Sequence, residues 1–231
     1  MPDYSRAGHR LVAQVFERLN AGLLARADCF FGGGTRLALT FDEYRESRDI
    51  DFLCAEPSGY ALLRSEVRQD SLGRILRRKI TLARDVRADR DGIRTFFSIG
   101  DARIKFEILL EARIALEGAI DPRFGVPTLS MPHQIAEKFL ANTDRGLDDS
   151  TLARDLVDLA FIAAHVEATD LARGLALAER PYGAAVRRAL VATLDRFAGD
   201  RRRARTCIET LAIDDTATLR NGLRVLRRLV R

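Results

Sequence analysis

Two aspartates separated by one residue, Asp49 and Asp51, are the side chains of this sequence best placed to bind a metal ion. They lie in the stretch 49–53 (DIDFL), where carboxylates alternate with apolar residues as they do in a half-buried strand. Side chains at i and i+2 of a strand point to the same side of the sheet. Because Mg²⁺ prefers oxygen ligands, the pair predicts a magnesium site.

A glycine run precedes this pair in the chain. Gly32 to Gly34 follow an apolar strand over 29–31 and lead into a short helix predicted over 35–41. Glycines after a strand allow backbone N–H groups to close on phosphate oxygens, and the start of a helix adds its positive dipole end. A triphosphate held beside two metal-binding carboxylates is the equipment for phosphoryl or nucleotidyl transfer. A lone glycine run is more often a turn, and a lone Asp-x-Asp is more often solvated surface, but their order and spacing favour function.

Hydrophobic spacing predicts the elements that must position these residues. Apolar residues at helical spacing indicate one amphipathic helix over residues 6–26, and a polar loop is expected over 42–48. A helix is expected to begin at Pro57 and to reach Asp70. Three further strands are predicted over residues 79–87, 93–99 and 103–110. Gly100-Asp101-Ala102 between the last two predicts that they form a hairpin.

The chain changes character after three prolines, Pro122, Pro127 and Pro132. From Ser130 onward it is rich in Ala, Leu and Arg and is predicted to form about five helices. We therefore expect two domains, an α/β domain over 1–128 and a helical domain over 129–231. The fold class is α+β.

Four short stretches of the sequence resemble the signature of the AbiEii/AbiGii toxin family of nucleotidyltransferases. Residues 33–39 (GGTRLAL) and 45–52 (RESRDIDF) are similar to the family pattern GGTxLAL followed by RxSxDIDF. Residues 137–141 (EKFLA) with Arg145, and then 154–159 (RDLVDL), are similar to its helical EKLxA…R block and RDxxDL block. The four motifs occur in the family's order.

The resemblance implies a fold and an activity. The fold would be a polymerase-β-type nucleotidyltransferase core with a mixed sheet, followed by a C-terminal helical bundle. The activity would be Mg²⁺-dependent transfer of a nucleoside monophosphate from a nucleoside triphosphate, held in the cleft between the two halves, to an acceptor hydroxyl such as the 3′ end of tRNA. The protein would act as the toxin of a toxin–antitoxin system and would therefore have a cognate antitoxin as partner.

The resemblance also implies roles for particular residues of the α/β half. Gly33, Gly34 and Thr35 would bind the nucleotide phosphates. Ser47 would contact the nucleotide beside the metal site, and the magnesium ligands and catalytic carboxylates would be Asp49 and Asp51.

In the helical half the resemblance points to a lysine, an arginine and an aspartate. Lys138 would contact the triphosphate, Arg145 would also bind the nucleotide, and Asp155 would be a catalytic acidic residue. Only three of the 38 basic residues are lysines, so a lysine kept at 138 independently favours a need for a compact ammonium. The alternative is a helix-surface lysine paired with Glu137 or Asp144.

Polymerase-β-type sites commonly have a third carboxylate on a later strand. Glu107 is the best candidate, because in residues 103–108 (RIKFEI) it shares one strand face with Lys105, and the two resemble the family's corresponding strand. An ordinary exposed Lys–Glu strand face is the competing interpretation.

Charge indicates a polyanionic partner. The net charge is +5, and residues 181–231 hold 12 arginines against five acidic residues. Arginine-rich stretches at 77–79 and 201–205 could contact RNA phosphates, although a solvated helix surface explains the same pattern. An acceptor on a protein or small molecule, and a binding protein without catalysis, remain alternatives.

The remaining composition narrows the class of protein. No apolar run approaches the roughly 18 residues that a membrane-spanning helix needs, and the N-terminus does not resemble a signal peptide, so we expect a cytoplasmic protein without membrane contact. The cysteines Cys29, Cys54 and Cys207 lack metal-ligand spacing and are expected to be reduced thiols. The three histidines receive no role.

Overall fold

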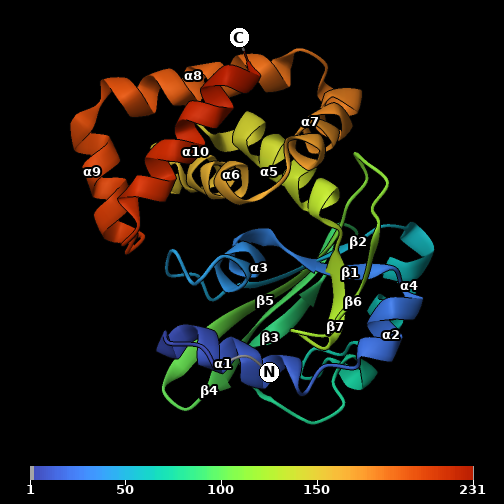
Figure 1. The fold of residues 1–231 in the computed structure, drawn as a ribbon. Coiled ribbons are helices and arrows are strands. Elements are labelled where there is room, and N and C mark those ends of the chain that lie inside the picture. The colour runs from blue at the N-terminus through green and yellow to red at the C-terminus, as the bar shows by residue number, and fades with distance from the viewer. Residues whose placement is uncertain (1–2, 231) are drawn as a thin grey trace. The chain divides into compact units, whose positions relative to one another are not determined.

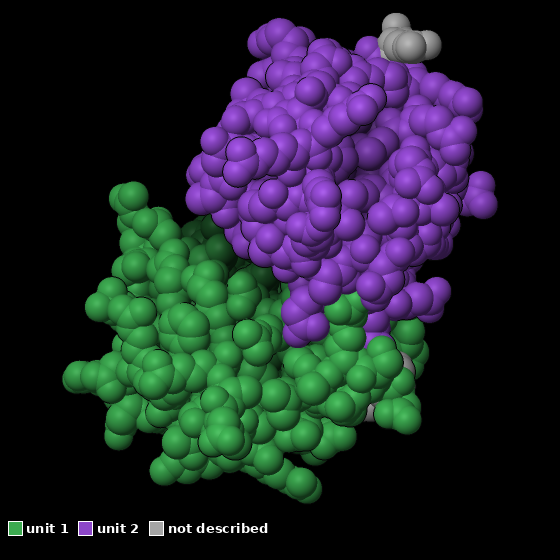
Figure 2. Space-filling view, turned by 90° about the vertical axis from the view of Figure 1, so that its left-hand side faces the viewer, with its two compact units in different colours: residues 1–39, 47–130 green, residues 40–46, 131–231 purple. Residues whose placement is uncertain are grey.

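The computed structural model describes residues 3–230, which fold as a mixed α+β protein (Figure 1). The chain divides into two compact units, one formed by Met1–Leu39 and Ser47–Ser130 and the other by Thr40–Glu46 and Met131–Arg231 (Figure 2). The predicted α+β class is confirmed. The sequence did not indicate that residues 40–46 belong with the helices.

The first unit is built on a seven-stranded mixed sheet in the order β3-β4-β5-β2-β1-β7-β6. Its strands are β1 (Cys29–Gly32), β2 (Ile50–Cys54), β3 (Thr81–Ala88), β4 (Gly92–Ile99), β5 (Ala102–Leu110), β6 (Gly118–Asp121) and β7 (Val126–Leu129). β2 runs antiparallel to β1 and parallel to β5, so Asp51 lies on a central strand, whereas Asp49 precedes β2. Buried aromatic rings on these three strands form part of its core, with Phe31, Phe52 and Phe106 each fully buried.

Four α-helices accompany the sheet in chain order: α1 (Ala7–Phe16), α2 (Ala21–Arg26), α3 (Gly33–Thr40) and α4 (Pro57–Glu66). The single helix predicted over 6–26 is wrong, because the chain breaks between α1 and α2. There Leu19 forms an isolated bridge with Leu76, and the Asn20 side chain accepts a hydrogen bond from the Leu23 amide at 3.1 Å and so begins a new helix. α4 is also shorter than predicted.

The strand predictions are confirmed for β3, β4 and β5, and β4 and β5 form the expected hairpin. Gly100 in its turn has a φ of +56°, which suits glycine. The strands β6 and β7 were not predicted. They are four residues long, and Pro127, interpreted as part of a boundary, lies inside β7.

The second unit is helical, with six α-helices in residues 131–230 where about five were predicted. They are α5 (Met131–Arg145), α6 (Arg154–His165), α7 (Ala168–Tyr182), α8 (Ala185–Gly199), α9 (Arg201–Thr210) and α10 (Thr216–Leu229). Gly222 on α10 packs so closely on α6 that an added Cβ would lie 1.7 Å from the Ala160 carbonyl oxygen. No helix within residues 3–230 has the length and apolar character to cross a membrane.

Candidate active site

The glycine turn and Asp51 touch each other. β1 ends at Gly32, which pairs with Asp51 of β2, and α3 begins at Gly33 with a φ of +73°. A Cβ added to Gly33 would lie 2.5 Å from an Asp51 carboxylate oxygen, Oδ2. Both the backbone conformation and the space therefore require glycine here, and the carboxylate rests directly on the strand-to-helix turn.

The two aspartates are held differently. Asp51 is half-buried and lies in the middle of the sheet, paired with Gly32 on one side and with Glu107 on the other. Asp49 is exposed and precedes β2, which begins at Ile50. The sheet thus fixes one carboxylate and leaves the other on the incoming loop.

These residues fit a magnesium ion that is bound through few protein ligands. Among residues 3–230 no group of three or more His, Cys, Asp or Glu side chains is gathered as a closed metal site. Mg²⁺ commonly takes one or two carboxylates, and water or substrate phosphates supply its other ligands. The Asp51 carboxylate lies against the Gly33 turn, and with the exposed Asp49 two residues earlier it provides a donor set of this kind.

Two hydrogen bonds link three residues that are far apart in the sequence. The Thr35 and Ser47 hydroxyls share a hydrogen bond of 2.8 Å, and the Ser47 amide donates to the His9 Nε2 at 3.3 Å. Thr35 and His9 are almost fully buried. The pairing of Thr35 with Ser47 joins two predicted site residues, whereas His9 was given no role.

Glu107 lies beside Asp51 but is already paired with cations. The parallel register of β2 and β5 places Asp51 opposite Glu107. The Glu107 carboxylate is 2.5 Å from the Lys105 ammonium and 3.5 Å from the Arg94 guanidinium. The candidate third carboxylate thus lies on the strand next to Asp51, and its charge is balanced by two neighbouring cations.

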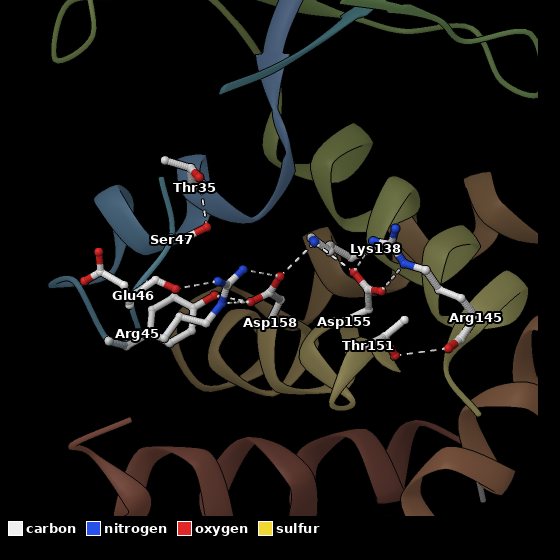
Figure 3. A network of polar contacts seen from close by, with 10 residues as sticks. Thr35, Arg45, Glu46, Ser47, Lys138, Arg145, Thr151, Asp155 and Asp158 are labelled. Atoms are coloured by element: carbon white, nitrogen blue, oxygen red, sulfur yellow. Dashed lines mark hydrogen bonds and ion pairs between the residues drawn. The ribbon is translucent and has the colours of Figure 1, made fainter. Parts of the chain in front are cut away.

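Lys138 is buried in the second unit between two aspartates (Figure 3). It lies on α5 with 5% of its surface exposed, and its Nζ is 2.9 Å from Asp155 Oδ1 and 2.7 Å from Asp158 Oδ2. Burial opposes the charged form, but the carboxylates of Asp155 and Asp158 outweigh it and raise the pKa of Lys138. Lys138 is thus a charged, buried residue, and its partners differ from the surface pairing with Glu137 or Asp144 considered from the sequence.

Asp155 is shared by Lys138 and Arg145. Arg145 of α5 reaches it with two nitrogens, Nε at 2.8 Å and one terminal nitrogen at 3.1 Å. Burial alone would raise the pKa of Asp155, but the two cations hold it well below its usual value. Asp155 is therefore an ionised, fully engaged carboxylate, while the Arg145 side chain is 41% exposed.

Sequence reasoning missed the other half of this network, Asp158 with Tyr44 and Arg45. The Arg45 guanidinium binds both Asp158 oxygens, at 2.7 and 3.0 Å, and the Tyr44 hydroxyl donates to Asp158 Oδ1 at 2.6 Å. The Tyr44 ring stacks on Phe161 with centroids 3.9 Å apart. Arg45 and Asp158 lie in two of the family-like motifs, RESRDIDF and RDLVDL. Their place in these motifs was the feature of the sequence that could have indicated a role for them.

The predicted site residues thus form two groups. Gly33, Asp51 and Glu107 adjoin one another in the first unit, where Thr35 meets Ser47. The second group lies within the helical unit and consists of Lys138, Arg145 and Asp155.

A strand, a glycine turn and a helix are followed by a central strand that carries Asp51, with Asp49 just before it, and this arrangement is typical of a nucleotidyltransferase. The profile of the nucleotidyl transferase AbiEii toxin family, of type IV toxin–antitoxin systems, matches residues 19–224. The chain belongs to that family, as the motifs suggested.

Solved structures support the same fold. A candidate nucleotidyltransferase from H. pylori superimposes with a TM-score of 0.58 and 19% identity, over 99% of this chain and 96% of that one. JHP933 from Helicobacter pylori gives a TM-score of 0.54 and 18% identity, over 99% of this chain and 93% of that one. No curated protein matches the sequence.

Proposed function

We propose that this toxin transfers a nucleoside monophosphate from a nucleoside triphosphate to the 3′-terminal hydroxyl of an RNA, with tRNA as the acceptor, in a magnesium-dependent reaction. The observation that carries the proposal is the contact between the Asp51 carboxylate and the Gly33 turn. That contact supports the proposal, because a carboxylate that can bind a metal lies beside a glycine turn whose backbone N–H groups would suit phosphate oxygens.

Asp49 and Asp51 would hold the magnesium ion. When bound, the ion would neutralise charge on the phosphates and favour attack at the α-phosphate. Gly33, Gly34 and the start of α3 would orient the phosphate groups, because their amides and the helix dipole favour negative charge. The Thr35–Ser47 hydrogen bond would keep the residues next to this turn in place.

Glu107 is the proposed third carboxylate, and it would serve in this role only if it exchanged its two cations for the metal. Its ion pairs with Lys105 and Arg94 favour a second task, which is to balance charge next to Asp51. Metal affinity in a Glu107→Gln variant would separate these roles.

Lys138, Arg145 and Asp155 would serve the triphosphate from the helical unit. Lys138 can contact a phosphate only if its ammonium exchanges an aspartate for a phosphate oxygen, because both aspartates lie within 3 Å of it. Arg145 has more freedom, since its guanidinium is partly exposed and a planar fork suits phosphate geometry. Asp155 would orient both cations.

The RNA acceptor is supported by the distribution of arginines on α9 and α10. Arg201 and Arg202 are exposed, as are Arg220 and Arg224. Arg203 differs, because its side chain is 11% exposed and pairs with Asp149. Exposed arginines on these two helices can contact RNA phosphates, and such contacts do not depend on the RNA sequence.

Family membership supports a cognate antitoxin as partner, and we propose that the protein acts in the cytoplasm, where nucleoside triphosphates and RNA are found.

The proposal is tested by incubating the protein with Mg²⁺, total RNA and each of the four α-labelled nucleoside triphosphates. We expect label on a tRNA-sized RNA with at least one nucleotide, and none without Mg²⁺ or with Asp51→Asn. Label on the protein itself, or on a small molecule, would replace the RNA acceptor. No transfer to any acceptor would contradict the proposal.

A further inference from the structure

His9 is a buried histidine that contacts the loop leading to the proposed metal site. It lies on α1 with no exposed surface, outside residues 19–224 that the family profile matches. Its Nε2 accepts a hydrogen bond from the Ser47 amide at 3.3 Å, and its ring meets Tyr4 edge-on with centroids 6.3 Å apart. A buried polar side chain with a backbone partner this far away in the sequence fixes two segments together.

The loop needs such a contact because the sheet does not hold it. Asp51 is secured by ladder pairing on both sides, with Gly32 and Glu107. Residues 47–49 precede β2, so their backbone has no ladder partners and their position depends on other bonds. Asp49, one of the two proposed metal ligands, lies in this stretch.

Ser47 is the residue at which the loop is attached to the rest of the first unit. Its side chain bonds Thr35 on α3, and its backbone bonds His9 on α1. The Thr35–Ser47 bond joins two hydroxyl groups, which can rotate about their side-chain bonds. The bond to His9 involves the Ser47 amide and therefore restrains the main chain itself. The backbone at 47 is two residues from Asp49, so its displacement would move that carboxylate.

We propose that His9 is a positioning residue, which holds the Ser47 backbone so that the Asp49 carboxylate stands where it can share a divalent cation with Asp51. The inference rests on the proposed function, because it assumes that these two aspartates bind the metal. It adds the N-terminal helix α1 to the parts of the protein on which metal binding depends.

The hydrogen bond specifies the chemistry that position 9 needs. A ring nitrogen that accepts a hydrogen bond carries no proton itself, so this bond requires the tautomer with its proton on Nδ1. A glutamine side chain can place its amide oxygen close to the position of Nε2 and accept the same bond. A leucine fills similar space and cannot accept it.

The test measures binding of Mn²⁺ alone to the full-length protein, by electron paramagnetic resonance of the free ion. We expect His9→Leu to raise the Kd for Mn²⁺ about tenfold, which is the scale of losing an outer partner of a metal ligand, and His9→Gln to stay within a few-fold of the wild type. Transfer activity at saturating Mg²⁺ should recover most of its wild-type value in both variants.

Two matched controls separate positioning from general damage. Val12→Ala removes a buried methyl-bearing side chain from the same helix without touching Ser47, and His165→Leu removes a histidine from α6. Both should bind Mn²⁺ as the wild type does. Equal weakening in Val12→Ala and His9→Leu, or unchanged binding in His9→Leu, would overturn the inference.

If His9→Leu does not fold, a measurement on the wild-type protein still tests the inference. The chain has only three histidines, so ¹⁵N spectra can assign the tautomer of each ring. We expect His9 to carry its proton on Nδ1 at neutral pH, and a proton on Nε2 would contradict the proposal. If the wild-type protein binds no Mn²⁺ at a site that Asp51→Asn removes, the proposed function is wrong. If that site exists but substitutions at position 9 do not change its affinity, only this inference is wrong.

Discussion

The two groups of site residues differ in how the protein treats their charge. In the first unit Asp49 is exposed and Asp51 half-buried, and the backbone alone brings Asp51 against the glycine turn. In the second unit Lys138 and Asp155 are almost completely buried and bind each other. The first pair is thus the more exposed of the two, whereas Lys138 and Asp155 are bound to each other inside the helical unit.

The difference follows from the cost of burying charge. An isolated charge inside a protein is strongly unfavourable, so buried ions occur with partners that offset their lost hydration. The helical unit satisfies this with alternating signs along the series Arg45, Asp158, Lys138, Asp155 and Arg145 (Figure 3). Asp49 is exposed and Asp51 half-buried, so neither carboxylate is as deeply buried as those of the helical unit.

The largest effect on nucleotide transfer is expected for the carboxylates of the first unit. Asp51→Asn should abolish nucleotide transfer, because the remaining oxygen and amide bind a divalent cation poorly. The fold should persist and could gain stability, since one of two neighbouring like charges is removed. Transfer of labelled nucleotide and the thermal unfolding midpoint, measured on the same preparation, check both parts. Near-normal transfer in Mg²⁺ would contradict the metal-site assignment.

Lys138→Ala should lower both stability and rate. Breaking a buried ion pair leaves two carboxylates without their shared cation and costs about 3–5 kcal/mol of unfolding free energy. If Lys138 also stabilises the leaving pyrophosphate, the rate per folded molecule should fall about 10²-fold. Lys138→Arg should rescue poorly, because a planar fork does not fit a point-charge site. Lost stability with an unchanged rate would make the residue purely structural.

Lowering the pH should reduce the stability of the helical unit, because its buried aspartates would become protonated. Asp155 and Asp158 have folded-state pKa values below the unfolded value of about 3.9, so their contribution is present above that pH and is lost as pH falls below it. The pKa of Lys138 is raised, so its contribution is complete below its unfolded value of about 10.4 and is lost as the pH rises from there through its higher folded-state pKa.

Asp155→Asn provides the comparison for this effect. The variant should be less stable than the wild type at pH 7, and the gap should shrink at pH 3, where the wild-type carboxylate begins to lose its advantage. Denaturant unfolding followed by circular dichroism at both pH values measures the gap. A constant gap would show that ionisation of Asp155 does not contribute to stability.

The smallest effect concerns the exposed arginines. Reversing Arg201 and Arg202 to Glu should raise the KM for RNA. It should also reduce the salt dependence of that KM, because RNA binding with fewer phosphate contacts releases fewer counterions. The KM for the nucleoside triphosphate should not change. Arg203 should be left intact, since its pairing with Asp149 is structural. If both KM values respond alike, or neither does, these arginines do not bind the acceptor.

Local sequence was sufficient to predict the elements around the active site. Gly33 and Asp51 were predictable because a glycine turn after an apolar strand and a period-two alternation are determined by neighbours in the chain. The single helix over 6–26 failed for the opposite reason. Its break depends on Leu19 pairing with Leu76, and no local pattern contains that contact.

The sequence by itself therefore determined the class of protein, the strands and glycine turn around Asp51, and the carboxylates proposed to bind a metal, since each depends on residue type and short spacing. Tertiary structure alone decided which partners those residues have. It joined Lys138 to Asp158, Thr35 to Ser47 and Ser47 to His9. Burial is the physical reason, because the partner that a charge or amide requires inside a fold is set by what packs beside it and not by what precedes it in the chain.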